Sequence, residues 1–180
     1  MLPGSINTSG YEGSPSISID NRRLYFTREA DPTDNRDLRD ISCKSLYFSD
    51  YENGQWQEAI RMPSPINFEC DRYPSFLADN RFLIYSSIRP APLNAAGNPQ
   101  EKRYGGFDLF YTERIAQRIW SAPKILPFGT AHYDVGFTMD ATGDKIFFTR
   151  GQGEKLGQAA IYTIETRKDM PFPKPVKAIH

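Results

Sequence analysis

The 180-residue chain carries one pattern of turn and strand residues three times, at intervals of about sixty residues. The segment SISIDNRRLYFTR at residues 16–28 returns as SFLADNRFLIYSS at 75–87 and as GFTMDATGDKIFFTR at 136–150. The turn aspartates of the three copies are 59 and 61 residues apart, and the apolar residues three positions before them keep these intervals. The residues are Asp20, Asp79 and Asp140, preceded by Ile17, Phe76 and Phe137. A period in this range is typical of repeat architectures, in which each copy is one structural unit.

A second marker has the same period. The segment LPGSIN, which begins at Leu2, returns 60 residues later as MPSPIN from Met62, and more loosely as LPFGTA from Leu126. Repetition of this kind specifies a scaffold more strongly than it specifies a chemistry.

The composition indicates a β-rich domain without a strongly charged surface. The chain has 10 Tyr and 12 Phe beside 14 Pro and 13 Gly, which favours many short strands joined by turns. Lys plus Arg and Asp plus Glu both number 22, so no global field attracts nucleic acid. No apolar run has the length of a transmembrane helix, and the first ten residues lack the features of a secretory signal. We therefore expect neither nucleic-acid binding nor membrane insertion.

Each unit reads as four short strands. The second strands are continuous apolar runs bounded by turn residues, which indicates burial on both faces. The turns before them contain Asp20-Asn21 and Asp79-Asn80. Asp and Asn suit tight turns, because they tolerate the left-handed backbone conformation. In the third unit the sequence predicts a longer turn, in which Gly143 takes the left-handed angle. The expected first strands are 14–18, 73–77 and 135–139, the second strands 23–28, 82–87 and 145–150, and the third strands 45–50, 107–113 and 160–165. The fourth strands are expected to begin at Trp56, Trp120 and Phe172, where Pro123 and Pro175 suit an outer strand.

These residues make the chain resemble the WD40-like β-propeller repeat of the TolB type, which is common in bacterial envelope proteins. That repeat has an acidic residue, Pro, a strand, a turn, an apolar strand, a loop ending in Gly-Gly-x-Asp, and Trp. The first unit matches it at Glu12, Pro15, 24–26 and Trp56; the second matches it at Asp71, Pro74, YGGFDLFY from Tyr104, and Trp120. In the third unit His132 stands for the acidic residue, Val135 for Pro and Phe172 for Trp. The resemblance implies an all-β fold of three four-stranded antiparallel blades of a TolB-like β-propeller.

The repeat boundaries divide the chain into a tail and three blades. Residues 1–10 are assigned to the end of a preceding blade, 11–67 to blade one, 68–130 to blade two and 131–180 to blade three. Propellers usually have four to eight blades, so we expect an incomplete propeller, a fragment of a longer protein. Two alternatives stay open: two copies combine into one ring, or the partial propeller is open and exposes apolar faces at its ends.

The sequence contains no recognisable catalytic, cofactor or metal motif. It has no Gly-x-Ser-x-Gly, no His-Glu-x-x-His and no phosphate-binding glycine loop, and His132 and His180 are its only histidines. The spacing of Cys43 and Cys70 does not indicate a metal site, and the two are either a disulfide or two free thiols. The repeated aspartates Asp20, Asp79 and Asp140, together with Asp108, are interpreted as turn and loop caps. We expect no cofactor and no catalytic residue.

Three arginines are the candidate ligand-binding residues. Arg28, Arg89 and Arg150 each close a second strand and lead into the long loops 29–44, 90–106 and 151–159. Corresponding positions of successive blades lie on one propeller face, where guanidinium forks bind carboxylates or phosphates. The alternative interpretation is that each arginine pairs with an aspartate of a neighbouring blade.

The resemblance implies a non-enzymatic interaction scaffold of the bacterial cell envelope, located in the periplasm. Its partner is expected to be an envelope protein or a small polar or anionic ligand bound by loops on one face, and a complete chain of this kind would self-associate. The alternative is a carbohydrate-active enzyme, a polysaccharide lyase or glycosidase, because TolB-like propellers also occur in polysaccharide lyases.

Overall fold

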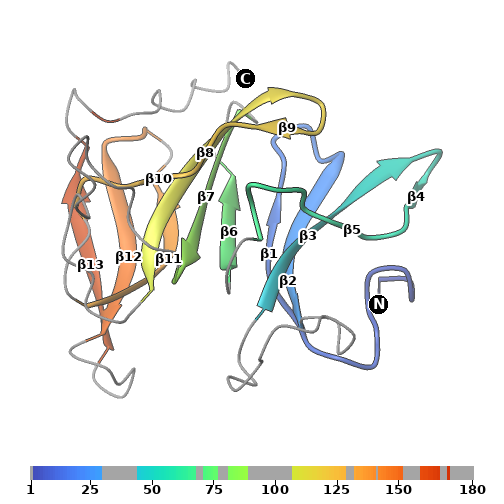
Figure 1. Ribbon diagram of the computed structural model, residues 1–180, viewed down its shortest axis with the longest axis horizontal. Coiled ribbons are helices and arrows are strands. Elements are labelled where there is room, and N and C mark those ends of the chain that lie inside the picture. Colours follow the sequence, from blue (N-terminus) through green and yellow to red (C-terminus); the bar gives the residue numbers. More distant parts are fainter. Residues whose placement is uncertain are drawn as a thin grey trace.

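The computed structural model describes residues 2–29, 44–67, 71–76, 81–88, 107–128, 132–140, 142–151, 159–166 and 170. These residues form three antiparallel β-sheets that follow one another across the molecule in the order of the sequence (Figure 1). The first strand of the second sheet contacts the first strands of both neighbouring sheets. The fold is therefore all-β and has the three units that the repeat predicts.

The strands lie close to their expected positions. Sheet one contains β1 (Glu12–Ile17), β2 (Arg23–Glu29), β3 (Lys44–Glu52), β4 (Gln55–Trp56) and β5 (Ile60–Arg61). Sheet two contains β6 (Arg72–Phe76), β7 (Phe82–Ser87), β8 (Asp108–Ala116), β9 (Ile119–Trp120) and β10 (Lys124–Ile125). Sheet three contains β11 (Tyr133–Met139), β12 (Lys145–Gly151) and β13 (Ala159–Glu165), and the fourth strand expected from Phe172 lies outside the described residues.

The fourth strand is split into two short pieces in sheets one and two. Both pieces pair with the third strand of their sheet, and the chain between them leaves the ladder. A hydroxyl of the third strand bonds this intervening chain: Ser49 Oγ donates to Gln57 O at 2.6 Å, and Thr112 Oγ1 donates to Ser121 O at 2.7 Å. In sheet two Pro123, which has no N–H to donate, occupies this interruption.

The first strand of every sheet contains a β-bulge with one residue of positive φ. These residues are Ser14, Tyr73 and Gly136, with φ of 51°, 55° and 62°. Each lies where the pairing with the second strand shifts. The bulges fix the alignment of the three units and make Asp134 the equivalent of Glu12 and Asp71. The assignment of His132 to that position is therefore wrong, and Phe137 rather than Val135 stands in the place of Pro15 and Pro74.

The third unit is shifted by two residues from the alignment expected from its sequence. Met139 lies opposite Ile146 as Ile17 lies opposite Leu24, so Met139 and not Phe137 is the equivalent of Ile17. The turns in the first and third units have the same length, because Ser18 N donates to Arg23 O and Asp140 N donates to Lys145 O. The longer turn predicted for the third unit is thus absent.

The conformations predicted within these turns are confirmed where the structure describes them. Asn21 and Gly143 occupy equivalent positions with φ of 56° and 71°. The turn at Asp79-Asn80 lies outside the described residues.

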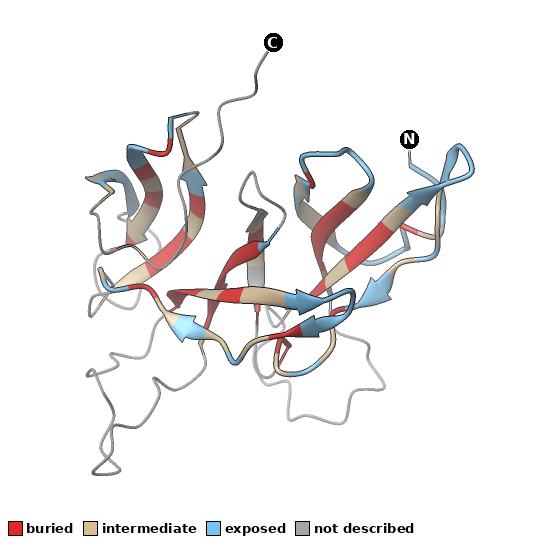
Figure 2. Cartoon of the chain, turned by 90° about the horizontal axis from the view of Figure 1, so that it is seen from above, coloured by how far each residue is buried: buried red, intermediate tan, exposed pale blue. Residues whose placement is uncertain are grey.

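The hydrophobic core consists mainly of two layers between the sheets, and Figure 2 shows buried segments in all three. Every residue of β7 is buried, as its continuous apolar run predicts. One layer joins sheet one, through Tyr25, Leu46 and Phe48, to sheet two. The other joins sheet two to sheet three through residues that include Ile84, Leu109, Ile146 and Phe148. β7 thus lies in the middle sheet of the stack, with one core layer on each side of it.

The second sequence marker twice forms a turn that is closed by the same backbone hydrogen bond, although only the second turn contains a cis peptide, Ser64–Pro65. Ile6 N donates to Pro3 O at 2.9 Å, and Ile66 N donates to Pro63 O at 3.0 Å. The asparagine that follows each isoleucine bonds back to the start of its turn, from Asn7 Nδ2 to Leu2 O and from Asn67 Nδ2 to Met62 O. The repeated marker is therefore a structural joint that precedes sheet one and sheet two.

Candidate functional site

Arg28 and Arg150 occupy equivalent places near the ends of β2 and β12. Arg28 lies opposite Glu12 in the pairing of β1 with β2, and Arg150 lies opposite Asp134 in the pairing of β11 with β12. The candidate site consists of these two arginines with their partners. The two arginines thus occupy the same position in the pairing of the first and second strands of sheets one and three.

The Arg28 guanidinium is fixed by a carboxylate, a turn and two aromatic rings. Its Nε lies 3.0 Å from Glu12 Oε1, and its Nη2 donates to Ile6 O at 2.6 Å. Its central carbon lies 4.8 Å from the centre of the Tyr47 ring and 5.3 Å from that of Phe26. The side chain is mostly buried, so the turn that precedes sheet one is held against β2 by one cation.

The Arg150 guanidinium has the same kinds of partner. Its Nε and Nη2 bind the two oxygens of Asp134 at 2.6 and 2.9 Å, and Nη2 also donates to Phe128 O at 3.1 Å. The rings of Phe148 and Tyr162 lie 4.9 and 5.3 Å from its central carbon. A bidentate arginine–carboxylate pair with both groups largely removed from water is a strong and geometrically specific contact.

Sheet two has a serine at this position. Arg72 pairs with Ser86, so the preceding residue of the first strand, Asp71, lies opposite Ser87. Ser87 is buried, and the aromatic positions are held by Tyr85 and Phe110, whose rings stack at 6.4 Å. Arg89 comes two residues later and lies outside the described residues.

The acid partners of the arginines were not assigned this role from the sequence. The alternative interpretation expected an aspartate of a neighbouring blade, whereas Glu12 and Asp134 belong to the same sheet as their arginines. A signal for the pairing exists, because both arginines follow their acid by 16 residues. That constant separation is what a bulged strand, a tight turn and a second strand of fixed length require.

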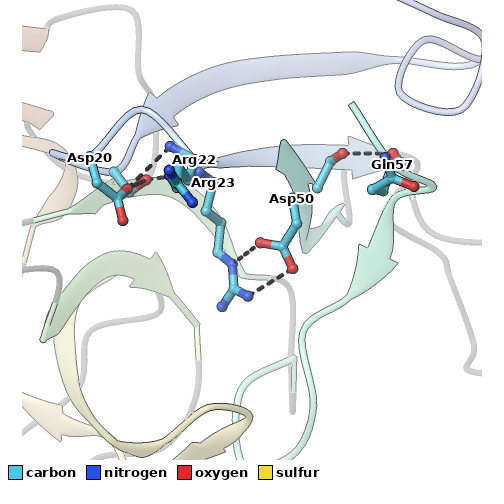
Figure 3. A network of polar contacts seen from close by, with 7 residues as sticks. Asp20, Arg22, Arg23, Asp50 and Gln57 are labelled. Carbon is cyan, nitrogen blue, oxygen red and sulfur yellow. Dashed lines mark hydrogen bonds and ion pairs between the residues drawn. The ribbon is translucent and has the colours of Figure 1, made fainter. Parts of the chain in front are cut away.

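A different ion pair lies at the other end of β2. Arg23 donates from Nε to Asp50 Oδ1 at 2.5 Å and from Nη2 to Oδ2 at 2.8 Å (Figure 3). Arg81 and Glu113 form an exposed pair at the corresponding end of sheet two. Arg23 and Arg28 thus mark opposite ends of one strand, and only Arg28 belongs to the candidate site.

The turn aspartates cap backbone amides, as predicted. Asp20 Oδ1 accepts from the Ser18 hydroxyl at 2.6 Å and from Arg22 N at 3.1 Å (Figure 3). The hydrogen bond from Ser18 lowers the pKa of Asp20, although partial burial opposes this shift. Asp140 Oδ1 accepts from Asp144 N and Lys145 N, and the bond from Lys145 is the largest cause of its lowered pKa. Asp108, by contrast, is buried and begins β8 rather than lying in a turn.

The described parts of the chain contain no group of three or more His, Cys, Asp or Glu residues placed to hold a metal ion. Cys43, Cys70 and His180 lie outside those parts. In those same parts no helix is long and apolar enough to cross a membrane.

Solved structures show which fold these sheets form. TolB from Acinetobacter baumannii matches with a TM-score of 0.53 and 16% identity, over 85% of this chain and 29% of that chain. A protein described as TolB from Agrobacterium tumefaciens matches with a TM-score of 0.56 and 13% identity, over 88% and 46%. A chain from a study of two prolyl endopeptidases matches with a TM-score of 0.51 and 14% identity, over 94% and 22%.

At these identities the likeness shows the fold alone. The three sheets correspond to part of a TolB-like β-propeller, which confirms the resemblance found in the sequence. The chain spans less than half of the length of each of these structures. No protein-family model matches the sequence, and no curated protein does.

Proposed function

We propose that the chain is a non-enzymatic interaction module of a bacterial cell envelope, which binds an envelope protein or a small anionic ligand. The binding site would lie at the end of the sheets that carries Arg28 and Arg150. The observation that carries the proposal is that sheets one and three present a guanidinium in one repeated setting of acid, carbonyl oxygen and paired aromatic rings.

The fixed orientation of the two guanidinium groups supports binding. Nη2 of both groups and Nε of Arg150 donate hydrogen bonds to the protein, and Nε of Arg28 lies 3.0 Å from Glu12 Oε1 without a hydrogen bond. Nη1 of each group makes no hydrogen bond to the residues that the structure describes. Ordering a long side chain before a ligand arrives reduces the entropy lost on binding. An incoming carboxylate or phosphate would use Nη1 and need not displace Glu12 or Asp134.

The proposed location in the periplasm or cell envelope rests on the distant structural likeness to TolB.

NMR of the arginine Nε–Hε groups would test the site. The ¹⁵N-labelled chain would be titrated with an oligo-glutamate peptide and, separately, with inorganic phosphate. We expect the signals of Arg28 and Arg150 to shift in a saturable manner with at least one probe. Arg23 is the matched control, because it has a carboxylate partner but lies at the other end of β2.

Variants would separate binding from folding. Replacing Arg28 and Arg150 together by Lys keeps both charges but removes the planar fork, so affinity should fall. The melting temperature should fall too, because the fork also binds Glu12 and Asp134, and binding is therefore compared at a temperature at which wild type and variant are both folded. Equal shifts at Arg23, or no saturable shift with either probe, would show that the two arginines are structural only.

A further inference from the structure

Ile161 in β13 is 80% exposed, although its equivalents in the other sheets are core residues. It lies opposite Thr149 in the second strand, as Leu46 lies opposite Thr27 and Leu109 opposite Ser86. Leu46 and Leu109 are each 1% exposed, because the following sheet packs on them. In sheets one and two, the position equivalent to Ile161 thus contacts the sheet that follows.

The neighbours of Ile161 extend this surface. Because side chains alternate along a strand, Phe147, Thr149, Ala159 and Thr163 point to the same side as Ile161. We call these five residues the outer face of sheet three. Phe147, its aromatic member, is the equivalent of Tyr25 and Ile84, which are buried between sheets. The outer face therefore repeats the positions from which sheets one and two contact the sheet that follows them.

Sheet one has the opposite kind of surface. Its Ile17 is 48% exposed, whereas the equivalent Met139 packs between sheets two and three. Beside it lie Leu24, Phe26, Tyr47 and Trp56, which form one cluster with Ile6. We call Ile17, Leu24, Phe26, Tyr47 and Trp56 the outer face of sheet one. Leu24 and Phe26 are already buried in the cluster with Ile6, and Ile17 is the most exposed member of the face.

The outer face of sheet one has the chemistry of a known internal contact. Its series of leucine, two aromatic rings and tryptophan has counterparts in sheet two, namely Leu83, Tyr85, Phe110 and Trp120, all of which pack against sheet one. Ile6 covers this face from the preceding turn, as Ile66 does at the internal contact. The chain thus has two complementary outer faces, of the two kinds that meet inside the molecule.

We propose that the outer face of sheet three binds the outer face of sheet one in a second copy of this chain, and that the reciprocal contact closes a ring of two copies. The support is continuity with the two inter-sheet contacts already present. Two copies would bring together twice the three sheets that the described residues form, a number within the roughly four to eight blades of closed propellers.

The closed pair contains the same contact twice. Once one contact has formed, the second becomes intramolecular, so each contact strengthens the other. A charge placed in one outer face therefore weakens both contacts in a pair made of identical variants.

Native mass spectrometry and light scattering over a range of concentrations would test the proposal on the full chain. We expect a mass of two copies for the wild type, and single copies for Ile161→Asp and for Ile17→Asp. Each aspartate would be buried without a partner, which should raise the dissociation constant at least roughly 100-fold. Ile119→Asp is the matched control, because Ile119 is 60% exposed on the β8–β9 hairpin and belongs to neither face, so this variant should stay paired.

Mixing the two variants tests the direction of the contact. Ile161→Asp retains an intact outer face on sheet one, and Ile17→Asp retains one on sheet three, so the mixture can form one wild-type contact. We expect mixed pairs at concentrations where neither variant pairs alone. Thermal melting of the single variants should match that of a wild-type sample diluted to single copies, which separates lost pairing from lost folding.

Several results would overturn the proposal. A wild type that has the mass of one copy at every concentration excludes the second copy as the occupant. Pairing that survives both substitutions places the contact elsewhere, and open-ended polymers exclude the closed ring. Failure of the mixture to pair would exclude contact between sheet three of one copy and sheet one of the other. Ligand binding at Arg28, which lies over Phe26 and Tyr47 of the outer face of sheet one, is tested separately by the titration described above.

Discussion

Asp140 in sheet three and Ser18 in sheet one accept the equivalent backbone hydrogen bond, Asp140 with a carboxylate oxygen and Ser18 with its hydroxyl oxygen. Arg23 N donates to Ser18 Oγ at 2.8 Å, and Lys145 N donates to Asp140 Oδ1 at 3.1 Å. The backbone N–H groups of Ser18 and Asp140 donate in return to the carbonyl oxygens of Arg23 and Lys145, at 2.8 and 3.0 Å. One turn geometry is therefore maintained by a neutral acceptor in one unit and by a charged acceptor in another.

The charged acceptor should make the stability of sheet three depend on pH. Hydrogen bonds, the bond from Lys145 N first, hold the pKa of Asp140 below its ordinary value of 3.8. A lowered pKa in the folded state means that the carboxylate stabilises the fold above the ordinary value, and that this contribution is lost as pH falls through the lowered value. Asp140→Asn should therefore reduce the free energy of unfolding at neutral pH and lose this effect in acid. Urea unfolding at several pH values would measure the difference. Glu52→Gln, on the exposed β3–β4 hairpin, is the control, and an equal pH dependence there would contradict the prediction.

The pair between Asp134 and Arg150 should be far more important for stability than the pair between Arg81 and Glu113. The Asp134 side chain is 1% exposed, so Asp134→Asn leaves a mostly buried guanidinium without its counter-charge. Breaking a buried pair in this way costs about 3–5 kcal/mol. Arg81 is 59% exposed, and Glu113→Gln should cost only ~0–1 kcal/mol. Denaturant unfolding of both variants tests the order, and similar losses would show that Asp134 is not effectively buried.

Asn67 should be a critical residue of the joint between sheets one and two. Its side chain accepts from Leu46 N at 2.6 Å and donates to Leu46 O and Met62 O, both at 2.9 Å. Asn67→Ala removes these bonds from Leu46 N and Met62 O, whereas Leu46 O still accepts from Met62 N. Each buried group left unsatisfied costs roughly 1–3 kcal/mol. The side chain of Asn7, the equivalent residue, is only half-buried and donates only to Leu2 O, so Asn7→Ala should cost about 0.5–1.5 kcal/mol. Melting temperatures and hydrogen exchange at the Leu46 amide would measure both effects, and an unchanged Leu46 amide in Asn67→Ala would contradict the prediction.

The bulge at Gly136 should tolerate side chains according to their left-handed propensity. A Cβ at this position would have no atom within 4 Å, so the cost of substitution comes from the backbone angle alone. Gly136→Ala should destabilise by about 1–2 kcal/mol, Gly136→Asn by less and Gly136→Val by more. Thermal unfolding would give the order. Equal losses for all three variants would show that lack of space, and not the backbone angle, limits this position.

The sequence predicts the strands well because the strands are apolar runs that turn residues bound on both sides. It misplaces the third unit because side chains in a strand alternate with a period of two, so a shift by two residues keeps every side chain on its own face. Phe137 and Met139 are both apolar and fit the pattern equally. Only the bulge at Gly136 separates them, and the sequence does not reveal its register.

The candidate site could be predicted only in part. The arginines were found because they end equivalent strands, but their tie to Glu12 and Asp134 depends on the register across each bulge. In sheet two the same register places Ser87 where Arg89 was expected, since two residues again preserve the face of the strand. The division of the fourth strands depends on hydroxyl groups of the third strands, Ser49 and Thr112, which resemble ordinary strand residues in the sequence.

The turn shared by residues 3–6 and 63–66 also bears on how a chain of this kind lengthens. Each copy of the turn closes with the same backbone hydrogen bond, and a set of strands lies between the two copies. A gene duplication with both breakpoints in this turn would insert one whole sheet and create no new junction in the polypeptide. The inserted sheet would meet its neighbours through faces that already fit. Recombination events that add or exchange a whole sheet should therefore be tolerated more readily when their breakpoints lie in this turn than when they lie inside a strand.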